Sequence, residues 1–545
     1  MHAYLRVGLA ASGVLIALAA ASCSSSSSSS TPPPDSGAAA DTGARVDAGA
    51  ASQDAGASDA GAEAPSAVSY LDRPLRDQVD ALERGAISSV GLTGAYLARI
   101  AARDVGDGGV HAIIVSDPQA AAHAAALDSL RGHGALLQGA DILVKDNVDT
   151  QGIATTAGSL ALATNVPTAD AFVVQRLHAA QALMLGKTNL SEWANFRSTM
   201  ATSGWSSVGG QTYMGRNTAY DPCGSSSGSA AAVAAGLASA ALGSETDGSL
   251  VCPSSVNGVV GFKPTVGLVS RGGVVPISVS QDTVGPITRT VGDAARMLSV
   301  IAGPDPGDPA TMTIPAGTSL DFEAPLKTAS LKGKRLGFVS SFGFGPDVMS
   351  LFSAQTAVLQ KAGATVVTLT MDVGSWGPDE QTTLLYEFKA DIEAYLAAHP
   401  IPGQSKTLAD LIAFNTAHAA TVMPYFGQEL FTQAEATTGL TTPAYLTARQ
   451  NSQTKARLAI DTQLMTGNLD ALITPTMDPA WTIDYDAGDP ATLHGASSPA
   501  AAAGYPHLTV PMGTVNGLPV GMSFIGSAWQ DARVLALGYA YEQAR

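Results

Sequence analysis

Cysteine is scarce in this chain, which has three cysteines in 545 residues. Three are too few for a disulfide scaffold in a chain of this length, and their spacing matches no zinc-binding pattern. Cys223 and Cys252 flank one serine-rich stretch, so a bond between them stays open in an oxidising compartment. The simpler interpretation is that both are small buried apolar side chains. The cysteines therefore indicate neither a disulfide-rich fold nor a metal site.

Basic residues are also in short supply. The chain has 29 Lys and Arg against 46 Asp and Glu, which gives a formal net charge of −17. Residues 1–67 hold two basic and six acidic residues, so they account for −4 and leave −13 on the rest of the chain. An acidic body argues against nucleic acid and against anionic membrane surfaces as partners.

The first 67 residues lack the composition of a folded domain. Residues 1–22 have the features of an export signal, with Arg6 before an apolar run that is too short to span a bilayer comfortably. The sequence LAAASC resembles a bacterial lipoprotein signal with lipid on Cys23, but Ala20 stands where leucine is favoured, so ordinary cleavage is the alternative. Residues 23–67 are rich in Ser, Ala, Gly and Pro, which predicts a disordered tether. We expect an exported protein, either periplasmic or lipid-anchored at a bacterial cell envelope.

From residue 68 onward, strand and helix patterns alternate. Strand patterns at His111–Ser116, Ala140–Lys145 and Leu183–Gly186 alternate with helical patterns at Pro118–Gly132 and Asp170–Ala182. This alternation predicts an α/β fold. No convincing linker follows residue 67, so we expect residues 68–545 to form a single domain.

Three further patterns carry weaker expectations. Gly85 and Gly91 should break the helical pattern of Val79–Arg103 into pieces. Residues 257–270 predict a strand, a turn and a second strand. Residues 345–450 are mostly helical by pattern.

One stretch, Cys223–Ser249, has two glycine–serine clusters that bracket an alanine-rich segment of helical character. A helix over residues 229–238 would advance ~15 Å and a strand over residues 239–244 would return ~20 Å, so the two clusters meet. Ser225 and Ser249 would then lie within hydrogen-bond reach. The turn would also aim backbone N–H groups into one concavity, as an oxyanion hole requires. The residues that supply these N–H groups are Thr246, Asp247, Gly248 and Ser249.

Lys145 ends the buried strand pattern ADILVK. A lysine held at the edge of a core has its pKa lowered by desolvation, and it could then act as the base for a serine nucleophile through Ser225. Spacing alone does not decide between this interpretation and a solvated strand end beside a serine-rich packing helix without chemistry.

Two other motif interpretations are weaker. Residues 224–228 fit G-x-S-x-G, with Ser226 as the nucleophile, but no strand pattern precedes them. The later histidines also show no clear acidic partner for such a site; they are His399, His418, His494 and His507. A phosphate-binding loop is excluded because Ser229, and not lysine, follows the last glycine of this motif.

These motifs resemble the amidase signature family over essentially residues 68–545, with the signature core at about 140–300. The matching segments are LVKDN, CGSSSGSAAAVAAG and GSETDGSLVCPSSVNGVVGFKPTVGLVS. The resemblance implies a large mixed β-sheet with α-helices on both faces. It also implies Ser249 as the acyl-forming nucleophile, Ser225 as a bridging serine held by a cis peptide bond, and Lys145 as the base. The amides of Thr246–Ser249 would bind the oxyanion, and no metal or cofactor is required.

Cys223, Ser227 and Asp247 replace family glycines, and Asp247 adds a carboxylate beside the expected site. These variants, with segments such as SEWANF, LLYEFKA and YPHLTVPMG, are most similar to bacterial peptide amidases, which hydrolyse the C-terminal carboxamide of peptides. We expect residues 345–500 to supply the pocket walls.

Two alternatives stay open: a broader amidase that acts on small aliphatic or aryl amides, and a non-catalytic surface binding protein on an amidase scaffold. Transamidating relatives act with partner subunits on charged tRNA. An exported acidic protein has no access to that chemistry, so we expect an enzyme that acts on a peptide or small-molecule amide. The sequence has no feature that shows the oligomeric state, and the expectation is a monomer.

Overall fold

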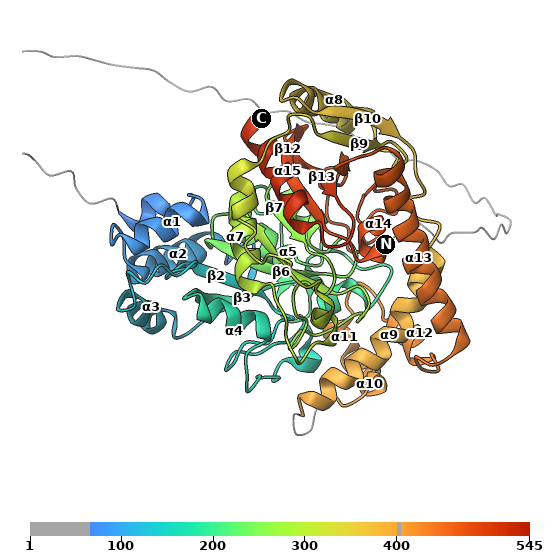
Figure 1. Ribbon diagram of the computed structural model, residues 1–545. Coiled ribbons are helices and arrows are strands. Elements are labelled where there is room, and N and C mark those ends of the chain that lie inside the picture. The colour runs from blue at the N-terminus through green and yellow to red at the C-terminus, as the bar shows by residue number, and fades with distance from the viewer. Residues whose placement is uncertain (1–65, 401–404) are drawn as a thin grey trace, which may run out of the picture. The chain divides into compact units, whose positions relative to one another are not determined.

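The computed structural model describes residues 66–400 and 405–545, and its centre is an eleven-stranded mixed β-sheet (Figure 1). The expected signal, the lipidation site Cys23 and nearly all of the tether lie outside the described residues. In pairing order, the strands are β1 (Ile113–Ser116), β3 (Leu183–Thr188), β2 (Asp141–Lys145), β6 (Ala240–Glu245), β8 (Thr283–Thr288), β7 (Val260–Lys263), β12 (His507–Val515), β13 (Leu518–Ile525), β11 (Ala471–Pro475), β9 (Arg335–Val339) and β10 (Thr365–Leu369). A separate pair is β4 (Trp205–Ser206) and β5 (Gly210–Gln211).

Helices cover the sheet and extend beyond it. They are α1 (Leu75–Glu83), α2 (Ser89–Arg103), α3 (Ala120–Asp128), α4 (Phe172–Ala179), α5 (Ser227–Ala234), α6 (Val251–Asn257), α7 (Val291–Ile301), α8 (Pro346–Lys361), α9 (Gly377–Ala398), α10 (Leu408–Ala417), α11 (Ala419–Val422), α12 (Glu429–Glu435), α13 (Pro443–Thr466), α14 (Ser498–Ala503) and α15 (Asp531–Ala544). Short 3-10 helices lie at Ala67–Tyr70, Leu160–Leu162, Glu192–Asn195, Pro309–Thr313 and Ala324–Thr328.

Strand β2 shows how the sheet is buried on both faces. Ile142 and Val144 point into one apolar cluster, which α4, α7, α8 and α15 complete. Leu143, between them, points into the opposite cluster with α2, α3 and α5. Successive side chains of a strand point to opposite faces, so an unbroken apolar run is what such a strand requires. The mixed sheet with helices on both faces confirms the predicted fold class.

The three strands β3, β2 and β6 are parallel neighbours. Their carboxyl ends therefore meet at one edge of the sheet, where open α/β sheets commonly bind ligands. Lys145 ends β2 and Glu245 ends β6, so two segments a hundred residues apart in sequence reach the same place. Helices α9, α10 and α12 pack on the loops near this edge through an apolar cluster that includes Trp193 and Ile277.

Two expectations about elements were wrong. Gly91 does not break a helix but lies inside α2, where its N–H binds the cap Ser88 Oγ at 3.0 Å. The break falls at Gly85, whose φ of +68° favours glycine. The second strand expected within residues 257–270 is a loop after β7. Residues 345–450 are mostly helical, as expected, and within them Thr365–Leu369 forms β10, which pairs in parallel with β9 along its whole length.

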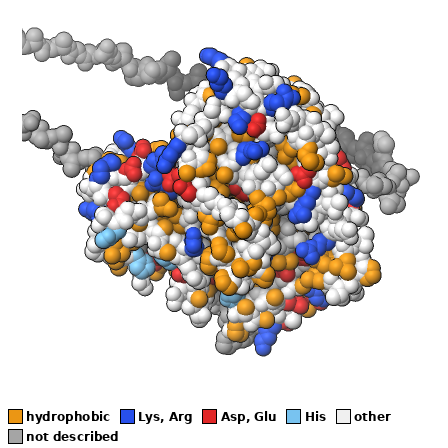
Figure 2. Space-filling view, viewed as in Figure 1, with side chains coloured by type: hydrophobic (Ala, Val, Ile, Leu, Met, Phe, Trp, Pro, Cys, Tyr) orange, Lys and Arg blue, Asp and Glu red, His pale blue; other side chains and the backbone are white. Residues whose placement is uncertain are grey.

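Figure 2 shows charged side chains of both signs on one face of the protein. On the face seen in Figure 2, lysine and arginine side chains lie in several separate groups among apolar and neutral residues. Within residues 66–400 and 405–545, no helix is both long and apolar enough to cross a membrane.

Candidate active site

Lys145 is the last residue of β2 and is fully buried. Its Nζ donates hydrogen bonds to Ser225 Oγ at 2.8 Å, to Ser244 Oγ at 2.9 Å and to the Ser244 carbonyl at 3.3 Å. No carboxylate of the described residues lies within ion-pair distance of this amine. Burial therefore lowers the pKa of Lys145 to about 7, although the more distant charges of Asp282 and Glu245 oppose the shift. A substantial fraction of the amine is neutral at neutral pH, as a base requires.

Ser225 lies in the turn that precedes α5. Its side chain is fully buried, and the Gly224–Ser225 peptide bond is cis, as the family resemblance implies. Two hydrogen bonds hold the neighbouring backbone in place: Ser191 N–H donates to the Ser225 carbonyl at 3.2 Å, and Ser226 Oγ donates to the Ser244 carbonyl at 3.0 Å. The hydroxyl of Ser225 is thereby fixed toward Lys145.

Ser249 lies in the turn between β6 and α6. Ser226 N–H donates to the Ser249 carbonyl at 3.1 Å, so the two serine-bearing turns are in direct contact. The helix between them, α5, is shorter than the predicted span 229–238, but strand β6 returns as expected. The hydroxyl of Ser249 makes no hydrogen bond within the described part of the chain, and it is therefore available to a substrate.

The backbone N–H groups of residues 246–249 are the expected donors of an oxyanion hole. Within residues 66–400 and 405–545, none of its four N–H groups has a hydrogen-bond acceptor. The next two N–H groups, of Leu250 and Val251, are instead held by Glu245 Oε2 at 2.7 and 3.1 Å. Gly248 has φ +80°, and a Cβ there would lie 3.0 Å from Ser497 Oγ, so this turn requires glycine. The turn presents unpartnered donors beside a free hydroxyl.

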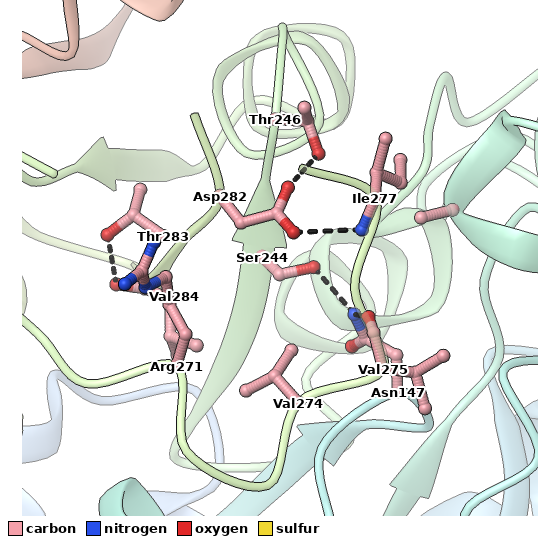
Figure 3. A pocket seen from close by; sticks show the side chains of 11 residues that line it. Asn147, Ser244, Thr246, Arg271, Val274, Val275, Ile277, Asp282, Thr283 and Val284 are labelled. Carbon is pink, nitrogen blue, oxygen red and sulfur yellow. Dashed lines mark hydrogen bonds between the residues drawn. The ribbon is translucent and has the colours of Figure 1, made fainter. Parts of the chain in front are cut away.

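Two residues that position the site, Ser244 and Asp282, were not predicted from the sequence. Ser244 joins Lys145 to Asn147, whose Nδ2 donates to Ser244 Oγ at 2.9 Å. Asp282 accepts hydrogen bonds from Thr246 Oγ1 at 2.5 Å and from Ile277 N–H at 2.8 Å (Figure 3). These side chains line a small cavity beside the Thr246 turn. No spacing rule points to either residue, because only the pairing of β6 with β8 brings Asp282 beside the turn.

Comparison with known proteins shows the family of this chain. The amidase family model matches residues 91–535. The chain belongs to the amidase signature family. It is an amide-hydrolysing enzyme, as the sequence predicts.

Individual amidases are similar over most of their length. A probable amidase of Arabidopsis thaliana is 39% identical over 453 residues, which cover 80% of this chain and 83% of the relative. A putative amidase of Arthroderma benhamiae is 36% identical over 489 residues, with 82% and 78% covered. The crystal structure of the native peptide amidase of Stenotrophomonas maltophilia is 48% identical, with a TM-score of 0.82 and 87% and 97% of the two chains covered.

Asp247 lies within the expected oxyanion turn. Its Oδ1 atom is buried and lacks a hydrogen-bond partner among the described residues. Gln281 Nε2 bridges the neighbourhood, since it donates to the Thr246 carbonyl at 3.3 Å and to Glu380 Oε1 at 2.8 Å. Burial raises the pKa of Glu380 to about 8, and the charge of Asp247 adds to the shift. Helix α9 thus brings a second carboxyl group, protonated at neutral pH, close to the oxyanion turn.

Cys223 and Cys252 form a disulfide, so the interpretation of two unbonded buried side chains was wrong. The Cα atoms are 6.1 Å apart, within the ordinary range for a disulfide. Sequence separation alone does not reveal such a pair. The turn before α5 and the first turn of α6 come together only because the two serine-bearing clusters meet.

The competing interpretation of Ser226 as an elbow nucleophile does not fit the structure. Its hydroxyl is fully buried and is bonded to the backbone of Ser244, and no histidine of the described chain contacts it. His399 binds Asp149 at 2.7 Å and His507 binds Ser523 Oγ at 2.6 Å, so both have other partners. Residues 66–400 and 405–545 contain no cluster of three or more His, Cys, Asp or Glu that could hold a metal ion.

Proposed function

We propose that this amidase hydrolyses the C-terminal carboxamide of peptides and releases ammonia through a Ser249–Ser225–Lys145 triad. The observation that carries the proposal is the contact of a fully buried, partly neutral Lys145 with Ser225 Oγ at 2.8 Å, next to a turn with a free serine hydroxyl and unpartnered N–H groups. A base, a proton relay, a nucleophile and oxyanion donors are the parts that serine acyl transfer needs.

The reaction begins when neutral Lys145 accepts a proton from Ser225 Oγ while Ser225 accepts one from Ser249 Oγ. Ser249 then attacks the amide carbonyl, and the negative charge that forms on the carbonyl oxygen is bound by the N–H groups of residues 246–249. The relay returns the proton to the departing nitrogen, so ammonia leaves and an acyl-enzyme forms. Water, deprotonated through the same relay, hydrolyses the ester and restores Ser249.

Similarity supports the peptide amide as substrate class. The peptide amidase of Stenotrophomonas maltophilia is 48% identical across most of both chains, and another peptide amidase structure, also 48% identical, was solved with the competitive inhibitor chymostatin. The helical segment α9–α13 contains no strand of the central sheet. Its first helix reaches the oxyanion turn through Gln281 and Glu380, so it is placed to contact the substrate beyond the scissile bond.

The first experiment is the Ser249→Ala substitution, with ammonia release from an amidated dipeptide as the measurement. We expect the rate to fall by at least about 10³-fold, since removal of a nucleophile abolishes the acyl-enzyme route. Ser254→Ala is a matched control from the following helix, because the buried hydroxyl of Ser254 has no hydrogen-bond partner within the described residues. Wild-type ammonia release by Ser249→Ala would sink the proposal.

The second candidate is a broad amidase for small aliphatic or aryl amides, in line with the less specific names of other relatives. A panel of amidated dipeptides, their free acids and simple amides separates the two candidates. A kcat/KM at least tenfold higher for the amidated dipeptides favours the peptide amidase. Equal values would favour the broader enzyme.

We also propose that the protein acts outside the cytoplasm, as a monomer, without nucleic acid and without metal or cofactor. The N-terminal sequence and the acidic composition support this placement. Mass spectrometry of the mature N-terminus distinguishes lipid on Cys23, which would tether the enzyme to a membrane, from ordinary signal cleavage. An intact residue 1 would contradict export.

A further inference from the structure

The disulfide connects the two turns that carry the serine hydroxyls. Cys223 lies two residues before Ser225, and Cys252 lies three residues after Ser249. The two sulfurs therefore join the chain just before the bridging serine to the helix that begins just after the nucleophile. Cys223 stands where the family pattern has glycine, so the cross-link is an addition to the family's shared catalytic residues.

The Cys223 side of the link belongs to an irregular loop. Cys223 has φ +56°, a region that side-chain-bearing residues rarely adopt. Hydrogen bonds hold its backbone on both sides: Cys223 N–H donates to Asp221 Oδ1 at 2.7 Å, and Ser227 Oγ donates to the Cys223 carbonyl at 2.7 Å. These contacts fix the loop locally. They do not tie it to the turn of Ser249.

The Cys252 side of the link belongs to the first turn of α6. Cys252 N–H donates to the Gly248 carbonyl at 2.8 Å, so the residue that carries the sulfur is hydrogen-bonded to the oxyanion turn as well as linked to it by three peptide bonds. At the other end of this helix, Asn257 Nδ2 donates to the Pro222 carbonyl at 3.0 Å. The Cys223 loop is thus attached to α6 at two points, one covalent and one hydrogen-bonded.

Only one hydrogen bond between the described residues joins the two serine-bearing turns directly, from Ser226 N–H to the Ser249 carbonyl. A proton relay through hydroxyls requires heavy-atom separations of about 2.6–3.2 Å at each step. A displacement of about 1 Å in one turn is enough to cost about 10²-fold in rate. Ser226 also exchanges hydrogen bonds with Ser244, just before the oxyanion turn. The disulfide adds a covalent constraint on the spacing of the two turns to these hydrogen bonds.

We propose that the Cys223–Cys252 disulfide is a positioning element of the catalytic relay. It holds the Ser225 turn against the Ser249 turn, so that its loss slows the chemical step as well as weakening the fold. This inference rests on the proposed roles of Ser225 and Ser249. It also agrees with an exported protein, since disulfides persist in oxidising compartments.

The experiment compares the folded enzyme before and after chemical reduction of the Cys223–Cys252 disulfide. Full-length protein carrying Cys23→Ser has these two cysteines alone, and a water-soluble phosphine reduces the disulfide to two thiols while the phosphine becomes its oxide. Mass spectrometry after alkylation counts the thiols, and circular dichroism identifies a temperature at which the reduced protein stays folded. At that temperature we expect kcat for an amidated dipeptide to fall at least about tenfold, with KM changed less than twofold, and reoxidation to restore kcat.

The Cys223→Ala/Cys252→Ala double variant gives the same answer without a reductant. It should show the lowered kcat of the reduced enzyme and no further response to phosphine. An unchanged kcat in folded reduced enzyme and in the double variant, whatever the change in unfolding temperature, would show a purely stabilising bond and overturn the inference. A KM effect without a kcat effect would also overturn it. Failure of the triad itself is detected separately, by Ser249→Ala.

Discussion

Lys145 and Lys187 are two lysines in the same structural situation with different partners. They lie on neighbouring parallel strands, near the carboxyl ends of β2 and β3, and both are fully buried. Lys187 Nζ lies 3.3 Å from Asp146 Oδ1 and donates to the Val148 carbonyl at 2.7 Å and to Thr155 Oγ1 at 2.9 Å. Lys145 Nζ has only two serine hydroxyls and a carbonyl.

The difference shows that the partner, and not burial, decides what a buried lysine can do. Burial lowers the pKa of both amines, but Asp146 adjoins Lys187 and opposes the shift directly. The carboxylates that oppose the shift of Lys145, Asp282 and Glu245, lie beyond ion-pair distance, so its pKa falls to about 7. Lys187 therefore serves as half of a structural ion pair, whereas Lys145 is available to accept a proton.

The largest expected effects come from replacing each lysine by alanine. Loss of Lys145 should mainly lower activity, and loss of Lys187 should mainly lower stability. Lys145→Ala should lower kcat/KM by about 10²–10⁴-fold near neutral pH, because the base is lost. Lys187→Ala should leave Asp146 buried and unpaired, so we expect a loss of about 3–5 kcal/mol in the free energy of unfolding. Both variants are measured by denaturant unfolding, for the free energy of unfolding, and by ammonia release, for kcat/KM.

The comparison fails if the two variants behave alike. Lys187→Met, which retains bulk without charge, controls for the cavity left by alanine. Activity is expressed per folded molecule, at a temperature where each variant remains folded. Full activity of Lys145→Ala without added amine would show that Lys145 is not the base.

The next largest effect is on pH dependence. Only neutral Lys145 can accept a proton, so kcat/KM should rise about tenfold per pH unit below pH 7 and level off above it. Asp282→Asn removes a negative charge that favours the protonated amine, so the acid limb should move to lower pH. Glu245 and the hydroxyls of Ser225 and Ser244 remain as in the wild type. An acid limb that moves to higher pH would contradict the assignment of Lys145 as the titrating base.

The smallest effect concerns the hydroxyl that Lys145 shares with Asn147. Ser244→Ala leaves two buried donors without that acceptor, which costs about 1–3 kcal/mol in stability, and we expect about a tenfold fall in kcat. Ser244→Thr restores the hydroxyl and should recover most of both losses. Equal kcat values for the alanine and threonine variants would show that this hydroxyl does not orient the base.

The sequence predicted the parts of the site that lie on local patterns. An apolar run that ends at Lys145 indicates a strand end, and the two glycine–serine clusters of Cys223–Ser249 indicate turns that meet. The structure places Lys145 and Ser225 in contact and brings the turn of Ser249 against Ser226. The expected hydrogen bond between Ser225 and Ser249 is not formed, since the hydroxyl of Ser249 has no hydrogen-bond partner within residues 66–400 and 405–545. Strand and helix alternation likewise predicted the α/β fold.

Features that depend on pairing between distant segments were not predictable. Asp282 reaches the oxyanion turn only through the antiparallel pairing of β8 with β6. The disulfide depends on the same convergence of turns, and the cysteine spacing carried no information about it. Strand β10 escaped because its short, half-exposed Thr-Val-Val-Thr-Leu pattern lies in a region dominated by helical periodicity.

The catalytic groups and the helices α9–α13 come from separate segments of the chain, which can be exchanged independently. The reacting groups and their donors lie within residues 145–249, at the end of β2 and in the turns before α5 and after β6. Helices α9–α13 come from a later segment that meets them mainly through loops and a few polar contacts such as Gln281–Glu380. Chimeras that exchange residues 377–466 among amidases should therefore transfer side-chain preference from one enzyme to another. The residues that carry out acyl transfer lie outside the exchanged segment and would be unchanged.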